Sequence, residues 1–403
     1  MKVAHIAYIF GEQNTGGAAI ASTRLHKALL SHGVESHYVC VRKMEDGENV
    51  HELPVGWKQK LFLFLTKVMR RMWKFTPYHK SICMNLVPLF GLERLLKRLN
   101  PDVVHVHWLN ADVASFEQIS KLPFRVVFNL HDLFVINALE PCPYADRRFI
   151  EGFNHSNSSW LERYLFNRKR NMISKLKASF IGPSRWVCEQ CKISIIGRGY
   201  DVYEVSNLIA PDYFAKLRNS ASIRTTKFTI LFGAYGGRKN ADKGFPDLVA
   251  ALQQIPQDIK RQCILKIYGE EAEDCDTEGV KTEFLGKISS AHQMIEILNS
   301  ADIFAFPSRA ETQGMTKVEA LICGVPVIAF ERTACSEGIV HEVNGWIADD
   351  GDIASYSRGI VYFFQLWQAG EIAQKHAVIA KIAKEQYDSR MILDKIILVY
   401  SNI

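Results

Sequence analysis

Short runs of apolar, often β-branched residues alternate along the chain with longer segments whose apolar positions recur every three or four residues. The short runs are apolar on both faces, which is typical of strands in parallel sheets that helices cover on each side. The longer segments have the period of amphipathic helices. The pattern therefore predicts an α/β protein. We expect eleven strands, at residues 3–10, 37–41, 103–107, 125–130, 178–182, 202–205, 228–232, 263–268, 282–284, 303–306 and 326–330.

Eleven strands are too many for one sheet of this kind, and the alternation restarts near residue 226. We therefore expect two doubly wound, Rossmann-like domains that face each other across a cleft. The predicted N-terminal domain covers residues 1–206. A polar stretch over 207–226, which lacks sustained periodicity, is the predicted linker. The second domain covers 227–385, and a last segment covers 386–403.

The composition places the chain among folded proteins with an ample core. Of 403 residues 48 % are apolar and 23 % are charged, and the net charge of +6 does not by itself indicate nucleic-acid binding. The first residues, MKVAHIAYIF, lack the basic start and cleavage site of a signal peptide, and there is no run of about 18 uncharged apolar residues. Nine scattered cysteines indicate a reducing compartment. We expect a cytoplasmic protein.

The segment ADIFAFPSRAETQGMTKVEALICGVPVIAF, residues 301–330, predicts a buried strand, a loop and a helix that starts near Thr316. Gly314 allows the backbone to approach a ligand closely, and the N–H groups at a helix start form an anion site. Glu311 precedes that site and Glu319 lies one turn inside the helix. A phosphate between two hydroxyl-rich groups is therefore the predicted ligand. For an isolated pair of this spacing, two solvated glutamates are the alternative.

This segment resembles the E-x7-E nucleotide-sugar element of retaining glycosyltransferases with the GT-B fold, those of glycosyltransferase family 4. The resemblance implies that Glu319 holds the ribose hydroxyls and that Glu311 contacts the donor sugar. It implies that backbone amides hold the diphosphate, at Gly314, Met315 and Thr316. It also implies that the last segment, 386–403, is a helix that crosses back to the first domain.

Two further elements follow predicted strands of the N-terminal domain. Gly16 and Gly17 open a helix after the first strand, where paired glycines permit a positive φ and bring amides beside a phosphate. The family has a similar Gly-Gly loop, which implies that both line the donor phosphate. His131 directly follows an apolar strand, as the histidine of the family's H-D element does, and the resemblance implies that it lies beside the donor sugar. His105 and His107 are interpreted as structural or acceptor-side residues.

A lysine directly before a helix stands in the second domain. Lys243 can neutralise a leaving diphosphate, where charge builds up in the transition state; a solvated surface lysine is the alternative. Lys243 and Gly244 match the family's K-G element, which implies that Lys243 is a diphosphate ligand. Arg238, in the preceding glycine-rich loop, is a further candidate for the same phosphate. The sequence has no G-x-G-x-x-G at either glycine-rich turn, so a dinucleotide cofactor is not indicated.

The basic excess concentrates in Trp57–Lys80, WKQKLFLFLTKVMRRMWKFTPYHK, which contains no acidic residue. Apolar residues recur there at helical spacing, with aromatic residues beside them. A basic amphipathic helix of this kind can lie on an anionic membrane surface. Alternatively, its apolar face packs on the N-terminal sheet and its basic face is solvated. Nucleic acid is disfavoured, because no known binding module accompanies the charge.

These observations predict a retaining glycosyltransferase of the hexosyltransferase type. The donor is a nucleotide sugar and the acceptor a glycan or lipid-linked glycan. More narrowly, the segments HDLF, PCPYADRR and IGPSRW resemble bacterial enzymes of exopolysaccharide or lipopolysaccharide synthesis. We expect no metal and no cofactor beyond the donor. The expected location is cytoplasmic, with peripheral attachment at the inner face of the membrane as the option that a membrane-bound Trp57–Lys80 would add. The alternatives are a GT-B nucleotide-sugar epimerase and a non-catalytic sugar-nucleotide-binding partner in a membrane assembly.

Overall fold

The computed structural model describes the chain except residues 14, 54, 58–59, 62, 66–67, 69–83, 110–113, 140–145, 155–156, 216–225, 234–237, 239, 272–274, 276 and 403. It divides into two compact units. Unit 1 consists of Met1–Leu208 with Ile392–Ile403, and unit 2 of Ile209–Met391. Each unit has its own parallel sheet and its own hydrophobic core.

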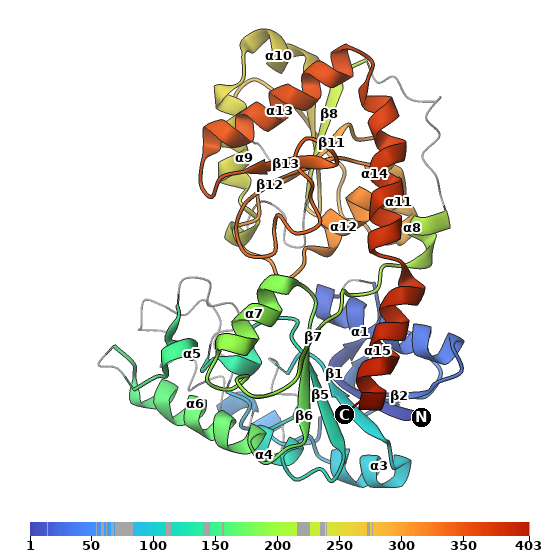
Figure 1. Ribbon diagram of the computed structural model, residues 1–403, viewed down its shortest axis with the longest axis vertical. Coiled ribbons are helices and arrows are strands. Elements are labelled where there is room, and N and C mark those ends of the chain that lie inside the picture. Colours follow the sequence, from blue (N-terminus) through green and yellow to red (C-terminus); the bar gives the residue numbers. More distant parts are fainter. Residues whose placement is uncertain are drawn as a thin grey trace. The chain divides into compact units, whose positions relative to one another are not determined.

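Unit 1 contains a seven-stranded sheet in the order β3-β2-β1-β4-β5-β6-β7, in which all neighbouring strands are parallel (Figure 1). The strand order reverses direction beside β1, which is the topology of a doubly wound sheet. The strands are β1 (Lys2–Phe10), β2 (Glu35–Lys43), β3 (Val50–Glu52), β4 (Val103–Val106), β5 (Arg125–Asn129), β6 (Ala178–Gly182) and β7 (Val202–Glu204).

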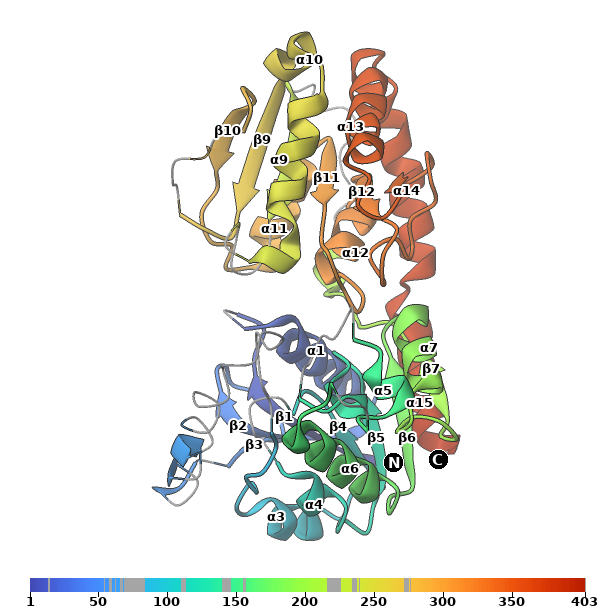
Figure 2. The ribbon, with the colours of Figure 1, turned by 90° about the vertical axis from the view of Figure 1, so that its left-hand side faces the viewer.

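Helices cover both faces of this sheet, because β1, β4, β5 and β6 are apolar on both sides. The helices are α1 (Gly17–Ser31), α3 (Leu92–Leu99), α4 (Phe116–Ile119), α5 (Arg148–Glu151), α6 (Trp160–Ile173), α7 (Arg185–Ile193) and α15 (Ser389–Asn402), with a 3-10 turn η1 (Phe134–Ile136). One core joins Val3 and Val127 of the sheet to Leu29 of α1 and Leu393 of α15. Figures 1 and 2 show α15 lying along this sheet on the same side as α1. The last helix thus returns to the N-terminal sheet.

Unit 2 contains a six-stranded parallel sheet in the order β10-β9-β8-β11-β12-β13. Its cores show that α9 and α13 cover one face, while α8, α11, α12 and α14 cover the other. The strands are β8 (Phe228–Gly233), β9 (Cys263–Tyr268), β10 (Lys281–Phe284), β11 (Ile303–Phe306), β12 (Val327–Phe330) and β13 (Gly345–Ala348). The helices are α8 (Pro211–Ala215), α9 (Phe245–Gln254), α10 (Gln257–Gln262), α11 (Ala291–Asn299), α12 (Met315–Ile322), α13 (Ile353–Gln368) and α14 (Ile372–Gln386), with a 3-10 turn η3 (Ala241–Lys243).

The predicted α/β class and the two parallel sheets are confirmed, and each of the eleven predicted strands corresponds to an observed one. The structure adds β3 and β13, which the sequence pattern missed. Both lie at an edge of their sheet and are short, with residues that are only partly buried, and β3 has no apolar run. Within the described part of the chain, none of the helices is long and apolar enough to span a membrane.

Candidate functional site

Lys243 and Glu311, predicted separately from the sequence, form an ion pair in unit 2. Lys243 Nζ lies 2.7 Å from Glu311 Oε1, and both side chains are partly buried. Lys243 ends η3 directly before α9, while Glu311 lies in the loop between β11 and α12. Burial alone would lower the pKa of Lys243, but the Glu311 carboxylate outweighs it and the pKa is raised. The lysine therefore stays charged at neutral pH.

A close approach at Gly244 holds Lys243 in place. Gly244 has a φ of 68°, and a Cβ there would lie 1.9 Å from the carbonyl oxygen of Pro307, which follows β11. Only glycine fits such a position. Beside it, the Arg309 N–H donates to the Asp242 carbonyl at 2.8 Å. The K-G element is thus fixed against the loop that leads into α12.

The loop after β12 supports Glu311 from the other side. The Glu311 N–H donates to Thr333 Oγ1 at 3.0 Å, and the Ala334 N–H donates to the Glu311 carbonyl at 3.3 Å. Thr333 has a φ of 48°, an uncommon conformation for a β-branched residue that persists only when its surroundings hold it. The sequence analysis missed Thr333, because nothing in its neighbourhood along the chain marks it.

The start of α12 has the form expected of an anion site. Gly314, with a φ of 76°, precedes the helix, and a Cβ there would lie 2.7 Å from Phe306 Cζ. The N-cap residue, Gly314, has no side chain to cap the first turn, in which Met315 and Thr316 are partly exposed. Amides at such a start attract anions. Their role as diphosphate ligands stays a prediction.

Lys317 is a buried lysine that the sequence analysis also missed. Its ammonium group donates to the carbonyl oxygens of Ala334 at 2.7 Å and Glu337 at 2.6 Å. Burial lowers its pKa to about 8. These contacts tie the first turn of α12 to the loop that supports Glu311, so both parts of the E-x7-E element rest on the same frame.

Glu319 lies one turn further into α12 and is only 6 % exposed. Tyr268, the last residue of β9, is also buried, and burial together with the Glu319 carboxylate raises the pKa of its phenol. The Tyr268 ring covers the end of β8, because a Cβ at Gly233 would lie 2.4 Å from it. Glu319 therefore stands beside the carboxyl ends of β8 and β9, where α/β sheets bind ligands.

A small cavity of about 10 Å³ lies at these strand ends. It has room for about one water molecule. Lys243 and Thr316 line it, together with Phe232, Gly233, Ala305, Phe306, Pro307 and Ser308. The K-G element and the first turn of α12 therefore meet at one point in unit 2.

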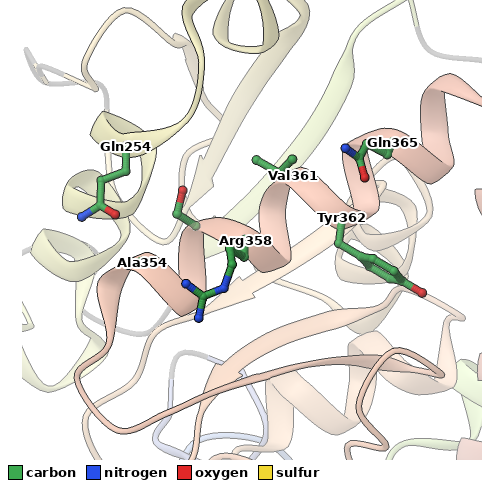
Figure 3. A pocket seen from close by; sticks show the side chains of 7 residues that line it. Gln254, Ala354, Arg358, Val361, Tyr362 and Gln365 are labelled. Atoms are coloured by element: carbon green, nitrogen blue, oxygen red, sulfur yellow. The ribbon is translucent and has the colours of Figure 1, made fainter.

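A larger hollow of about 330 Å³ lies elsewhere in unit 2, between the end of α9 and α13. Figure 3 shows Arg358, Val361 and Tyr362 along α13, with Gln254 of α9 beside them. It contains none of the predicted site residues, and α13 supplies six of its seven lining residues. We assign no role to it.

Arg238 lies toward the other edge of the sheet. Its Nε is 2.5 Å from Glu270 Oε1, and its guanidinium lies 5.0 Å from the centre of the Phe284 ring of β10. Neither group belongs to the Lys243 cavity. The neighbouring loop residues 234–237 and 239 lie outside the described residues. A phosphate contact of Arg238 stays a prediction.

The Gly-Gly loop of unit 1 leads directly into α1. Gly16 precedes the helix with a φ of −83°, so it does not use the positive φ that a glycine permits, and the chain enters α1 from an extended conformation. A Cβ at Gly16 would meet no atom within 4 Å among the described residues. The open space beside Gly16 is compatible with the predicted phosphate contact of Gly16 and Gly17, which stays a prediction.

His131 follows β5, as predicted, and Asp132 holds the turn. The Phe134 N–H donates to Asp132 Oδ1 at 2.9 Å, and Trp108 Nε1 donates to Asp132 Oδ2 at 2.9 Å. Burial of the ring lowers the pKa of His131 to about 4, although the residue keeps some exposed surface. Asp132 is therefore a structural residue that positions its neighbour.

Three buried histidines lie on the face of the unit 1 sheet that α1 and α15 cover. Ring nitrogens of His5, His105 and His107 lie within 4.8 Å of one another, so they are the group among the described residues that could hold a metal ion. However, His5 Nδ1 and His107 Nε2 already share a hydrogen bond of 2.9 Å. His105 Nδ1 is hydrogen-bonded at 2.7 Å to Tyr400 of α15. The predicted structural role of His105 and His107 agrees with these contacts.

The basic segment Trp57–Lys80 is described only in part. Five of its described large apolar residues are exposed, Trp57 72 %, Leu61 52 %, Phe64 61 %, Leu65 47 % and Val68 40 %, whereas Leu63 is half-buried. The alternative that this apolar face packs on the N-terminal sheet is therefore wrong for these residues. Residues 69–83, with most of the basic side chains after Val68, lie outside the described residues, as do residues 140–145 of the PCPYADRR segment.

Comparisons with known proteins agree with this architecture. Residues 15–194 match the family model described as Glycosyltransferase Family 4, and residues 214–386 match Glycosyl transferases group 1. An uncharacterized glycosyltransferase of Methanocaldococcus jannaschii is 23 % identical over 86 % of this chain and 85 % of its own length. The capsular polysaccharide biosynthesis glycosyltransferase CapM of Staphylococcus aureus is 22 % identical over 70 % of this chain and 80 % of its own length.

Among solved structures, Anabaena HepE in complex with UDP superposes with a TM-score of 0.61. The identity is 16 %, and the match covers all of both chains. At that identity the likeness shows the fold alone, which is GT-B. Together with the two family models, it shows that the chain belongs to the GT-B glycosyltransferases of family 4.

Proposed function

We propose that this glycosyltransferase moves a sugar from a nucleotide-sugar donor to a glycan or lipid-linked glycan, with retention of anomeric configuration. The Lys243–Glu311 pair is the observation that carries the proposal. It places a cation and a carboxylate beside the open first turn of α12, with buried Glu319 one turn further on. In a nucleotide sugar, a diphosphate joins the sugar to a ribose. A cation and backbone amides can bind the diphosphate, and carboxylates on either side can accept hydrogen bonds from the sugar and ribose hydroxyls.

In the proposed reaction, the protein supplies mainly electrostatics and position. Lys243 and the α12 amides stabilise the negative charge that develops on the leaving diphosphate. Glu311, which pairs with Lys243 in the ligand-free protein, accepts hydrogen bonds from the sugar hydroxyls. Glu319 accepts them from the ribose. We expect that no metal ion is needed, because the lysine and the helix start provide the positive charge.

Similar proteins support the choice of substrates. HepE has been solved with UDP, which supports a UDP-sugar donor. CapM acts in capsular polysaccharide biosynthesis, which supports a cell-surface polysaccharide as the product's destination. The exposed apolar residues between Trp57 and Val68, in a segment without acidic residues, support docking on an anionic membrane at its inner face.

Donor binding tests the proposal directly. Candidate nucleotide sugars are screened by thermal shift, because a ligand at 100 times its Kd stabilises by about 2.7 kcal/mol. The donor is then titrated calorimetrically into wild type and Glu319→Ala. Loss of a buried hydrogen-bond acceptor should weaken binding by about 1–3 kcal/mol. Glu296→Ala, at an exposed position of α11, is the matched control. Equal affinity in wild type and Glu319→Ala would remove Glu319 from the site.

Product analysis separates the remaining possibilities. With donor and acceptor present, NMR of the new glycosidic bond should show the anomeric configuration of the donor. An inverted product would refute the retaining mechanism. An epimerase would convert the donor with no acceptor present, and a non-catalytic binding protein would turn over neither mixture.

A further inference from the structure

Three histidine rings form a continuous hydrogen-bonded row in unit 1. His5 Nδ1 lies 2.9 Å from His107 Nε2, and His107 Nδ1 lies 3.0 Å from His131 Nε2. They come from β1, from the end of β4 and from the turn after β5, which are neighbouring strands. Both nitrogens of His107 are therefore engaged by other histidines.

All three rings are neutral at physiological pH, because burial lowers the pKa of each one well below its ordinary value. A neutral imidazole has one N–H donor and one acceptor nitrogen. In the first arrangement, His5 donates from Nδ1 and His107 accepts at Nε2. His107 must then donate from its own Nδ1, so His131 accepts at Nε2 and carries its proton on Nδ1. If the first proton instead sits on His107 Nε2, all three rings carry it on Nε2. The row thus permits only two arrangements.

The buried end of the row distinguishes these arrangements. His5 is fully buried, and its Nε2 has no hydrogen-bond partner among the described residues. The second arrangement would bury an unsatisfied N–H there, whereas the first leaves only an unpaired acceptor, which proteins tolerate more often. At the other end, Asn129 Nδ2 lies 3.2 Å from His131 Nε2 and 3.4 Å from Nδ1. Asn129 is close to both ring nitrogens, and in the first arrangement the single lone pair of Nε2 already accepts from His107, so Asn129 does not decide between the two arrangements.

We propose that His5, His107 and His131 share one tautomeric state with the proton on each Nδ1, and that His107 is a positioning residue that makes His131 a hydrogen-bond donor toward the substrate. The part that concerns the substrate rests on the proposed function; the tautomeric state does not. In this state His131 Nδ1–H donates to a sugar hydroxyl or phosphate oxygen. His131 is then not the base that deprotonates the acceptor.

The same cluster does not carry a metal proposal. A three-nitrogen site would need His5, His105 and His107 to bind one ion, yet His107 has both nitrogens in the row. An ion could enter only by breaking one of the two ring-to-ring hydrogen bonds. The row and a metal site therefore predict different tautomers.

The test is ring ¹⁵N NMR of the full-length protein labelled with ¹⁵N-histidine, in which protonated and bare ring nitrogens have separate chemical shifts. Signals are assigned by substituting one histidine at a time. We expect a protonated Nδ1 and a bare Nε2 in His5, His107 and His131. Three Nε2–H rings would overturn the assigned direction, and mixed tautomers would overturn the row. A change of the ring shifts on adding chelator would show a bound metal and would also overturn it.

Two variants of His107 test its positioning role. The carboxamide in His107→Gln offers one donor and one acceptor, so it should keep His131 in the Nδ1–H state, whereas His107→Phe should release His131 to a mixture of tautomers. The matched control is His105→Phe, whose ring packs 4.2 Å from that of His107 but is hydrogen-bonded to Tyr400. It should lower stability as much as His107→Phe while leaving the His131 tautomer unchanged. Equal effects of the two Phe variants on His131 would refute the role.

Activity then connects the row to the proposed function. With donor and acceptor supplied, kcat/KM of His107→Phe should fall about ten-fold relative to His105→Phe, and His107→Gln should restore most of it. If the NMR result holds and the kinetic difference is absent, the row exists but does not serve the substrate. If neither protein nor variants turn over any donor, the proposed function fails while the tautomers still stand.

Discussion

Mild acid, between about pH 6.5 and pH 5, should lower the free energy of unfolding of unit 1. The sheet face under α1 and α15 contains His5, His105 and His107, and His26 of α1 is buried beside them. Desolvation lowers the pKa of each ring, to about 4 for His26 and about 3 for His105. In the unfolded chain these histidines bind protons near pH 6.5, whereas in the folded unit they stay unprotonated at that pH. The stability is therefore complete above about pH 6.5 and is lost as the pH falls toward the folded pKa values.

The size of the effect follows from those two values. One pKa unit corresponds to about 1.4 kcal/mol, and a ring that titrates only in the unfolded chain makes stability fall by that amount per pH unit. At pH 5 the rings of His26 and His105 together cost about 4 kcal/mol. A typical domain is stable by only about 5–15 kcal/mol. The histidines alone should therefore bring unit 1 close to unfolding near pH 5.

Urea unfolding at about half-unit steps from pH 7.5 to pH 5 measures this loss, with hydrogen-exchange mass spectrometry to assign the unfolding to peptides of β1 and β4. His105→Gln removes one titrating ring, so its stability should depend on pH less steeply, by about 1.4 kcal/mol per unit. His32→Gln, at an exposed position after α1, is the matched control and should keep the wild-type slope. A flat wild-type profile, or the same slope in His105→Gln, would refute the reasoning.

Three further outcomes are expected. Lys243→Ala should lower kcat more than it raises KM, because the diphosphate gains charge as the bond breaks, and a normal kcat with only a raised KM would contradict this. Gly244→Ala should lower the free energy of unfolding by at least about 1 kcal/mol, because its Cβ would lie 1.9 Å from the Pro307 carbonyl oxygen after β11. An unchanged urea unfolding curve would contradict the close approach. Trp57→Ser with Phe64→Ser should reduce co-sedimentation with anionic vesicles, whereas Trp160→Ser, also at an exposed aromatic position, should not; equal binding would sink the membrane proposal.

The hydrophobic pattern predicted the interior of both sheets and one edge strand of each, β7 and β10, but missed the opposite edge strands, β3 and β13. β8 and β11 are buried along their whole length, so their sequences are apolar throughout and easy to detect. β3 is three residues long and is half exposed, and its sequence VHE has no apolar run. Such strands form because a neighbouring strand offers hydrogen-bonding partners, which is information from tertiary structure. β13 is similar, with two of its four residues only partly buried.

The candidate site was predictable where a local motif marks it. Glu311, Glu319 and Lys243 stand in recognisable spacings beside turns and helix starts. The ion pair between Lys243 and Glu311 joins residues 68 positions apart and depends on β8 and β11 being neighbours. Thr333 supports the site by accepting the Glu311 N–H through its side-chain hydroxyl, and Lys317 by donating to backbone carbonyls of another loop. Neither contact follows a recognisable spacing along the chain. Supporting residues of this kind are therefore the part that the sequence leaves open.

The histidine row shows how topology turns an ordinary pattern into a specific arrangement. His105 and His107 alternate along β4, so the sequence alone places them on one face of a strand. Their meeting with His5 requires the order β2-β1-β4, in which His5 is the register partner of His105. The last helix completes the arrangement, because Tyr400 of α15 binds His105 and covers that face. The rings of His5, His105, His107 and Tyr400 are buried in unit 1 because residues from both ends of the chain enclose them, and that burial lowers the pKa values of the three histidines.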